Sequence, residues 1–98
     1  MKLDRLDTLV KELNVLRANI SAINREIVQL RRARPHAERL RDLGFAVKDI
    51  IARSNRLVAR LRGVKGPARE SLGRVVGRIK GKAQELQRRY GTLIGMKL

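Results

Sequence analysis

Cysteine and tryptophan are absent from the 98-residue chain, and tyrosine, phenylalanine and histidine occur once each. Without cysteine the chain forms no disulfide, binds no metal through thiolates and has no cysteine nucleophile. A single histidine is too few for a histidine metal cluster. We therefore expect no catalytic residue, no cofactor and no metal site, and we predict that the protein is not an enzyme.

Long apolar segments are missing as well. No uninterrupted apolar run approaches the roughly 18 residues that a membrane-spanning helix needs. The first ten residues, MKLDRLDTLV, include two aspartates and lack the apolar region of a secretion signal. We expect a protein that is neither secreted nor transmembrane and that is located in the cytoplasm, at the nucleoid or inside a virion.

Acidic residues are scarce, since 24 lysines and arginines face 9 aspartates and glutamates for a net charge of +15. Self-repulsion of such an excess destabilises a compact monomer, and a polyanion relieves it. Apolar residues make up 43% of the chain and are nearly all aliphatic. Sheet domains normally contain more aromatic residues and threonine. The composition therefore predicts a core built from helices.

The first 30 residues contain an unbroken heptad pattern, in which apolar residues recur at alternating steps of three and four. Glu12 and Glu26 fall where Arg17 and Arg31 of a parallel copy would pair with them. The pattern predicts a coiled-coil helix over 1–34. Its partner is a second copy of the chain or, alternatively, the two following helices of the same chain. The predicted oligomerisation residues are Leu6, Leu9, Leu13, Leu16, Ile20, Ile23, Ile27 and Leu30.

Two breaks divide the rest of the chain. Pro35 lacks an amide hydrogen and clashes with the preceding turn, so it ends or kinks the first helix. A second amphipathic helix is predicted over 35–62, a glycine and proline turn over 63–67, and a basic, glycine-punctuated helix and tail over 68–98. The predicted fold is all-α, with about three elongated amphipathic helices that form a coiled coil, a helical hairpin or a bundle.

Glycines recur every four residues on the third predicted helix, about 40° apart around its axis. Each interior glycine costs about 1 kcal/mol relative to alanine, so this face needs a reason. Close approach of a second helix, close approach of a phosphate backbone and fraying are the alternatives. We predict close helix packing at Gly73, Gly77 and Gly81, and we expect Gly91 and Gly95 to fray the end of the helix.

The last 36 residues hold nine basic and two acidic side chains, for a net charge of +7. Neutralising backbone phosphates requires no sequence motif, and arginine adds bidentate contacts. The scarcity of aromatic residues argues against stacking on single-stranded bases. We therefore predict sequence-tolerant binding to nucleic acid, with double-stranded DNA as the leading partner. The predicted contact residues are Arg53, Arg60, Arg62, Arg74, Arg78, Lys80, Lys82, Arg88 and Arg89.

The function favoured by these patterns is a self-assembling, homo-oligomeric protein of nucleoid or nucleocapsid type that binds or packages nucleic acid. One alternative is a coiled-coil structural subunit of a virion or another large assembly that makes no contact with nucleic acid. A second is peripheral binding to an anionic membrane through the basic helix and the tail YGTLIGMKL. The lack of tryptophan and the single phenylalanine disfavour the membrane alternative, because aromatic side chains anchor proteins at the membrane interface.

Overall fold

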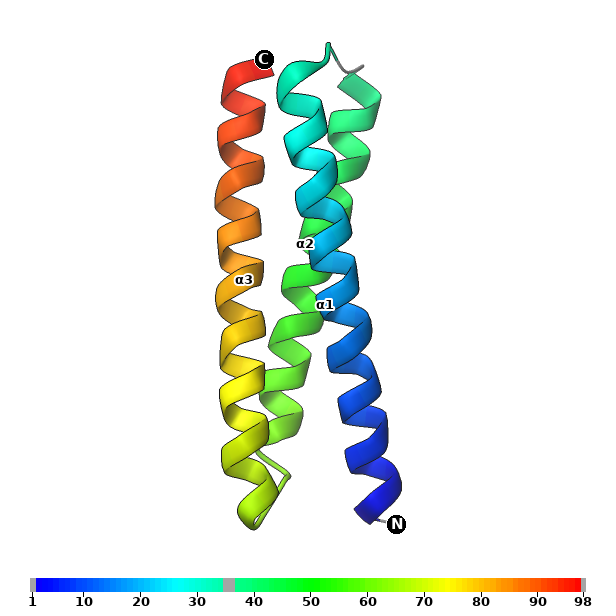
Figure 1. Ribbon diagram of the computed structural model, residues 1–98, viewed down its shortest axis with the longest axis vertical. Helices are drawn as coiled ribbons and strands as arrows, with labels where there is room; N and C mark the ends of the chain where they lie inside the picture. Colours follow the sequence, from blue (N-terminus) through cyan, green and yellow to red (C-terminus); the bar gives the residue numbers. More distant parts are fainter. Residues whose placement is uncertain (1, 35–36, 98) are drawn as a thin grey trace.

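The chain folds into three amphipathic helices. The computed structural model describes residues 2–34 and 37–97 (Figure 1). Helix α1 runs over Lys2–Arg32, α2 over Ala37–Leu61 and α3 over Pro67–Lys97. The described residues contain helices and short connections but no strand. The prediction of an all-α fold with packed amphipathic helices is therefore confirmed, and the arrangement is a three-helix bundle.

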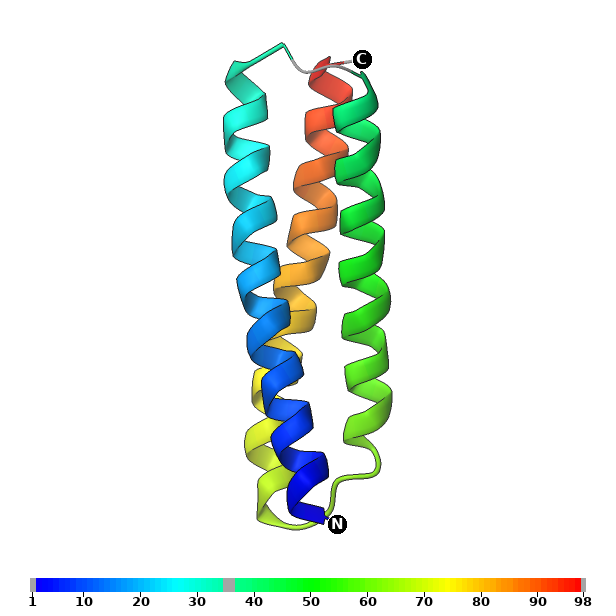
Figure 2. The same ribbon diagram turned by 90° about the vertical axis from the view of Figure 1, so that its right-hand side faces the viewer.

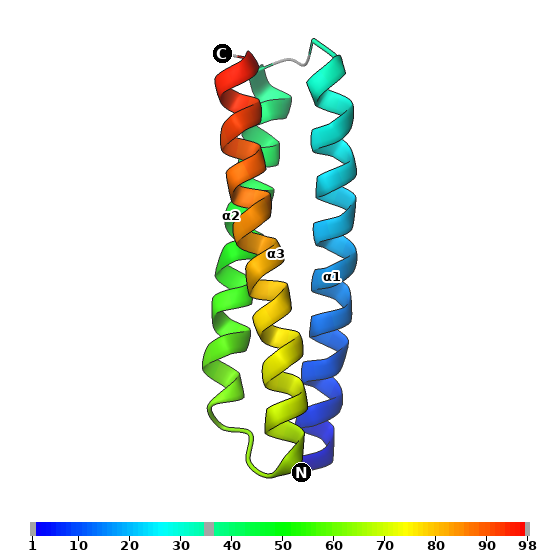
Figure 3. The same cartoon turned by 60° about the vertical axis from the view of Figure 1, so that its left-hand side comes forward.

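The helices run up, down and up along a rod with principal extents of 49 × 18 × 17 Å. Helices α1 and α2 are antiparallel, and α2 and α3 are antiparallel, so α1 and α3 run parallel to each other (Figures 2 and 3). Each helix packs against both others. The C-terminal ends of α1 and α3 consequently lie at the same end of the rod.

The first helix ends at Arg32, and a new helix begins at Ala37. The chain therefore breaks around Pro35 rather than continuing through a kink, although Pro35 itself lies outside the described residues. Lys97 caps this end of α1, because its ammonium group donates hydrogen bonds to the carbonyl oxygens of Arg31 at 2.9 Å and Ala33 at 2.8 Å. Carbonyls at a helix end lack partners within the helix, so this cap from the parallel helix stabilises them.

The second connection is a tight turn. Backbone amides of Gly63 and Val64 donate to carbonyls three residues earlier, at 3.0 Å each, which tightens the end of α2. Gly66 has a φ angle of +88°, a conformation that residues with a Cβ adopt at a cost. Pro67 then occupies the first position of α3, where its missing amide hydrogen costs nothing. The glycine and proline residues of the sequence thus produce the hairpin of α2 and α3.

The core lies along the axis of the rod and is built almost entirely from aliphatic side chains. Burial of each large aliphatic side chain contributes about 1.5–3 kcal/mol before the loss of chain entropy. Ser54 is buried among these residues, and its hydroxyl donates to the carbonyl of Ile51 at 2.9 Å, so it has a partner. The buried apolar residues are Leu9, Leu13, Leu16, Ile20, Ile27, Leu30, Leu40, Leu43, Val47, Ile50, Leu57, Val76, Ile79, Ala83, Leu86 and Leu93.

The heptad residues of α1 take part in this core within one chain. Six of the eight are buried, while Leu6 and Ile23 are partly exposed. Of the two arrangements that the heptad left open, the structure contains the bundle with α2 and α3, because the two short connections fold these helices back onto α1. Glu12 and Glu26 form ion pairs with Arg60 and Arg39 of α2. A role for the heptad in joining copies of the chain remains a prediction.

The C-terminal end of α3 differs from the expectation of fraying at Gly91 and Gly95. The helix continues through both glycines to Lys97. Leu93 is buried and Ile94 packs against the core, so apolar contacts on this turn compensate for the low helix propensity of glycine.

Candidate nucleic-acid interface

Positive charge is concentrated on α3. This helix holds eight basic and two acidic residues, for a net charge of +6, whereas α1 and α2 carry a net +3 each. Six of the nine predicted contact residues lie on it. Arg74, Arg78, Lys82, Arg88 and Arg89 are exposed, and Lys80 is half-buried. The sequence-derived focus on the last third of the chain therefore corresponds to one helix of the bundle.

The helix geometry separates these cations into two flanks of α3. Arg78, Lys82 and Arg89 follow one another at steps of four and seven residues and therefore lie along one line of the helix. Arg89 lines a groove together with residues of α1, which places this line on the flank that faces α1. Lys80 lies seven residues after Gly73, whose position next to Leu61 marks the flank that faces α2.

We call the exposed cations on the outer and α1-facing sides of α3 the α3 basic surface. Its local acidic neighbours are the two carboxylates of α3, each of which pairs with arginines of the same helix. Glu70 binds Arg74 at 3.1 Å, and Glu85 binds Arg88 at 2.5 Å and Arg89 at 3.3 Å. The surface consists of Arg74, Arg78, Lys82, Arg88 and Arg89.

The predicted contact residues on α2 are in a different environment. Arg60 forms an ion pair with Glu12 of α1, and Arg53 pairs with Asp49 at 3.4 Å. Arg53 and Arg60 are one heptad apart, so both lie on the flank of α2 that faces α1. The structure does not bring these two arginines together with the α3 basic surface. Arg60 links α2 to α1 through its ion pair with Glu12, whereas the ion pair of Arg53 lies within α2.

Four of the nine predicted residues have a side chain that forms no ion pair or hydrogen bond within residues 2–34 and 37–97. A cation without a carboxylate partner neutralises a phosphate without first losing an ion pair, so it contributes its full counterion release. These four residues are Arg62, Arg78, Lys80 and Lys82.

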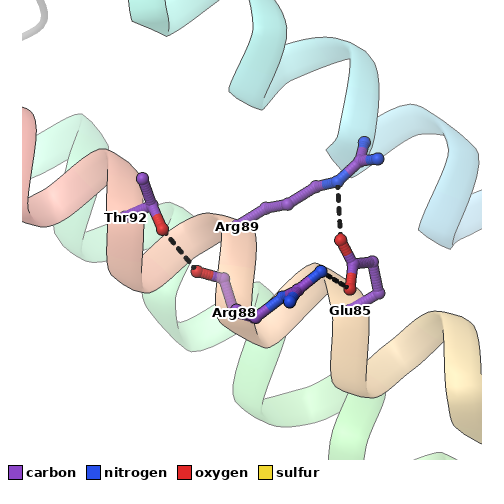
Figure 4. Close-up of polar contacts among 4 residues, drawn as sticks. All are labelled: Glu85, Arg88, Arg89 and Thr92. Carbon is purple, nitrogen blue, oxygen red and sulfur yellow. Dashed lines mark hydrogen bonds and ion pairs between the residues drawn. The ribbon is translucent and has the colours of Figure 1, made fainter.

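A groove of about 390 Å³ runs between α1 and α3 near their C-terminal ends. Its polar wall contains Glu85 between two arginines of α3 (Figure 4). Arg89 extends toward α1, and the hydroxyl of Thr92 donates to the carbonyl of Arg88 at 3.2 Å. The lining residues are Ile27, Val28 and Arg31 of α1 and Glu85, Arg88, Arg89, Thr92 and Leu93 of α3.

The two arginines keep Glu85 ionised. The hydrogen bond from Arg88 is the main cause that lowers the pKa of Glu85 below its ordinary value of 4.5. Partial desolvation opposes this change, and the charges of Arg88 and Arg89 add to it. The same hydrogen bond raises the pKa of Arg88. At neutral pH the groove therefore contains three guanidinium groups and one carboxylate.

The glycine face of α3 does not pack closely inside the bundle. A Cβ added at Gly77 or Gly81 would meet no atom within 4 Å, and one at Gly73 would make an ordinary contact of 3.7 Å with Leu61. Among the described residues, the close packing predicted for Gly77 and Gly81 is therefore absent, because both lie on the exposed side of α3. Because glycine has no side chain, the surface of α3 beside Arg74 and Arg78 carries no side chain at these two positions that would keep a ligand away from the helix backbone.

Sequence reasoning missed two features of this region. The heptad pattern assigns Arg31 to charge pairing with a parallel copy, yet Arg31 lines the same groove as Arg88 and Arg89. The glycine that does allow a close approach is Gly44, which lies against Tyr90. A lone glycine inside a strongly helical segment is the signal that was available for Gly44.

Within the described residues, no group of three or more histidine, aspartate or glutamate side chains is arranged to hold a metal ion. None of the described helices combines the length and the apolar character that crossing a bilayer requires. No family of known proteins, no characterised protein and no solved structure shows significant similarity to the chain.

Proposed function

We propose that this protein binds the backbone of double-stranded nucleic acid, DNA in the first place, through the α3 basic surface. The observation that carries the proposal is the line of Arg78, Lys82 and Arg89 along one flank of α3, in a helix with a net charge of +6. Arg78 and Lys82 have no carboxylate partner among the described residues. Such a line matches a row of phosphates and requires no base contact.

The shape of the bundle supports contact with a duplex rather than with single bases. The rod is 49 Å long, which corresponds to about 14 base pairs at 3.4 Å per step. Arg78 and Arg89 are separated by about 16 Å along the helix axis, at 1.5 Å per residue. The exposed glycines beside this line allow a phosphate backbone to approach α3 closely.

Packaging would place many copies of the bundle on one nucleic acid, either at a nucleoid or inside a virion. The side where α1 and α2 meet suits contact between neighbouring copies, because three ion pairs there neutralise part of its positive charge. The residues of this side are Glu12, Glu26, Asp49, Arg39, Arg53 and Arg60. Homo-oligomerisation on nucleic acid is therefore part of the proposal.

The test is a titration of a fluorescent duplex of scrambled sequence, read by anisotropy at 50 and 200 mM salt. With about five phosphate contacts, one for each cation of the α3 basic surface, the slope of log affinity against log salt should be about −4.5, so the affinity should fall about 500-fold between these conditions. Absent or salt-independent binding would refute the proposal. Binding to anionic vesicles but not to the duplex would favour the membrane alternative instead.

Two charge-matched double variants locate the interface. Arg78→Ala with Lys82→Ala removes two cations of the α3 basic surface, whereas Arg41→Ala with Lys48→Ala removes two exposed cations of α2. We expect the first variant to reduce the slope of log affinity against log salt by about 2, and the second to change it little. Equal losses in both variants would mean that net charge, rather than α3, determines binding.

A further inference from the structure

The groove between α1 and α3 differs from the rest of the basic surface because it has two walls. Arg88 and Arg89 come from α3, and Arg31 comes from α1. Ile27, Val28 and Leu93 form its apolar part. A ligand in the groove therefore meets cations from two helices, whereas a ligand on an open helix face meets cations from one.

The position of Arg31 in this groove depends on the parallel packing of α1 and α3. Lys97 ties the two helix ends together through its hydrogen bonds to the carbonyls of Arg31 and Ala33. The backbone that carries Arg31 is thus held at the level of the last turns of α3. Arg32, its neighbour in the same turn of α1, does not line the groove.

Glu85 occupies the place that an anion would take. It accepts from Nη2 of Arg88 and from Nε of Arg89, one donor from each guanidinium group. Each guanidinium has five N–H donors in a planar fork that also fits a phosphate. The ion pairs are exposed, so they are weak and open to exchange.

We propose that this groove is a phosphate-binding site in which a phosphate group displaces Glu85 from Arg88 and Arg89 and is held from the other wall by Arg31. The expected source is the nucleic-acid backbone, and in this respect the inference rests on the proposed function. Free phosphate has the same chemistry and would enter the same site. Glu85 then acts as an internal competitor that weakens nucleic-acid binding.

The first experiment measures duplex affinity and its salt slope for Glu85→Gln. Removing the carboxylate frees two arginines, so we expect the slope to increase by about 2 and the affinity to rise about tenfold or more at 50 mM salt. The control is Glu85→Gln combined with Gln87→Glu, which restores the net charge on another side of α3. We expect this double variant to keep most of the increase in duplex affinity. A return to wild-type affinity would show that net charge alone determines binding and would refute the phosphate-binding site.

The second wall is tested by a matched pair of neighbours. Arg31→Ala should abolish most of the increase in duplex affinity that Glu85→Gln produces. Arg32→Ala should lower the duplex affinity only as much as the loss of one distant positive charge does. Both arginines are exposed in the last turn of α1, so the two variants should be equally well folded. Equal losses of duplex affinity in the two variants would refute the binding of phosphate by Arg31 in the groove.

The third experiment separates this inference from the proposed function. Inorganic phosphate is titrated into the wild-type protein and into Glu85→Gln, and the arginine side-chain Nε–Hε signals are followed by NMR. We expect saturable shifts at Arg31, Arg88 and Arg89 that are stronger in the variant, and smaller shifts at Arg78. Uniform small shifts would overturn the site even if the duplex binds. Saturable shifts without any duplex binding would refute the proposed function and leave the phosphate site intact.

Discussion

The ring of Tyr90 on α3 occupies the space that a side chain on Gly44 of α2 would need. A Cβ at Gly44 would lie 2.9 Å from Cζ of the tyrosine and 3.3 Å from Cε1. The hydroxyl of Tyr90 donates to the carbonyl of Leu40 at 2.9 Å, one turn before the glycine. This contact sets how closely α2 and α3 approach at this end of the rod.

Gly44→Ala should therefore destabilise the protein even though alanine favours helix. Overpacking against the ring costs about 1–3 kcal/mol, and the gain in helix propensity returns about 1 kcal/mol. Gly77→Ala is the control, because its new methyl group meets nothing within 4 Å. We expect this control to be more stable than wild type by up to about 1 kcal/mol in urea denaturation. Equal stability of the two variants would contradict the close contact.

Lys97→Met should loosen the end of α1 without unfolding the bundle. The variant loses the hydrogen bonds to the carbonyls of Arg31 and Ala33, each from a charged donor at a helix C-terminus. A cation at this position stabilises a helix by about 0.3–1 kcal/mol. Hydrogen exchange should accelerate in the last turn of α1 and stay unchanged around Ile20. Unchanged exchange in that turn would show that the cap contributes nothing.

Asn24→Ala should stabilise the protein. The side-chain oxygen of Asn24 is buried and has no hydrogen-bond partner among the described residues. A buried polar group without a partner costs about 1–3 kcal/mol, and alanine also favours helix. Asn14→Ala on the exposed side of α1 gains the helix propensity only. The difference between the denaturation midpoints of the two variants measures the destabilisation caused by the buried oxygen. A difference of zero would mean that this oxygen has a hydrogen-bond partner in solution.

The ionisation of Glu85 should make stability fall in acid. Because the folded-state pKa of Glu85 is lowered, its contribution is present above the unfolded-state value near 4.5 and is lost as the pH falls through the folded value. The stability difference between wild type and Glu85→Gln should therefore decrease below pH 4.5. An NMR titration of the carboxyl carbon gives the pKa directly, and a value above 4.5 would contradict the ion pairs with Arg88 and Arg89.

The thermal midpoint should not depend on protein concentration. The apolar seam of α1 is covered by α2 and α3 of the same chain, so folding needs no second copy. Ile20→Ala should cost about 2–5 kcal/mol because Ile20 is 2% exposed, and Ile23→Ala should cost less because Ile23 is only partly buried. A midpoint that rises with concentration would instead support the heptad as a contact between copies.

Much of the fold was readable from periodicity. The steps of three and four residues identified six buried residues of α1, and the residues around Pro35 and Pro67 marked the breaks. The exception is the end of α3, where local propensity predicted fraying at Gly91 and Gly95. Packing of Leu93 against the core prevails there, because tertiary contacts outweigh propensity differences of about 1 kcal/mol.

The candidate site was readable only in part. Charge counting located the excess on the last third of the chain, but it grouped Arg53 and Arg60 with the α3 cations. Arg53 pairs with Asp49 at i,i+4 on its own helix, whereas Arg60 pairs with Glu12 of α1, a partner on another helix that no sequence spacing reveals. The sequence also does not show that Arg31 lines the same groove as Arg88 and Arg89, because these residues come from different helices.

The sequence by itself determined that this chain is helical, where its helices break and that its charge gathers toward one end, because periodicity, proline and charge are local properties. Only the tertiary structure decided that the heptad seam of α1 is covered by α2 and α3. It also decided that α1 and α3 run parallel, which brings Arg31 beside Arg88 and Arg89. These relations join residues far apart in the chain, and burial of apolar surface among three helices, rather than any local preference, selects them.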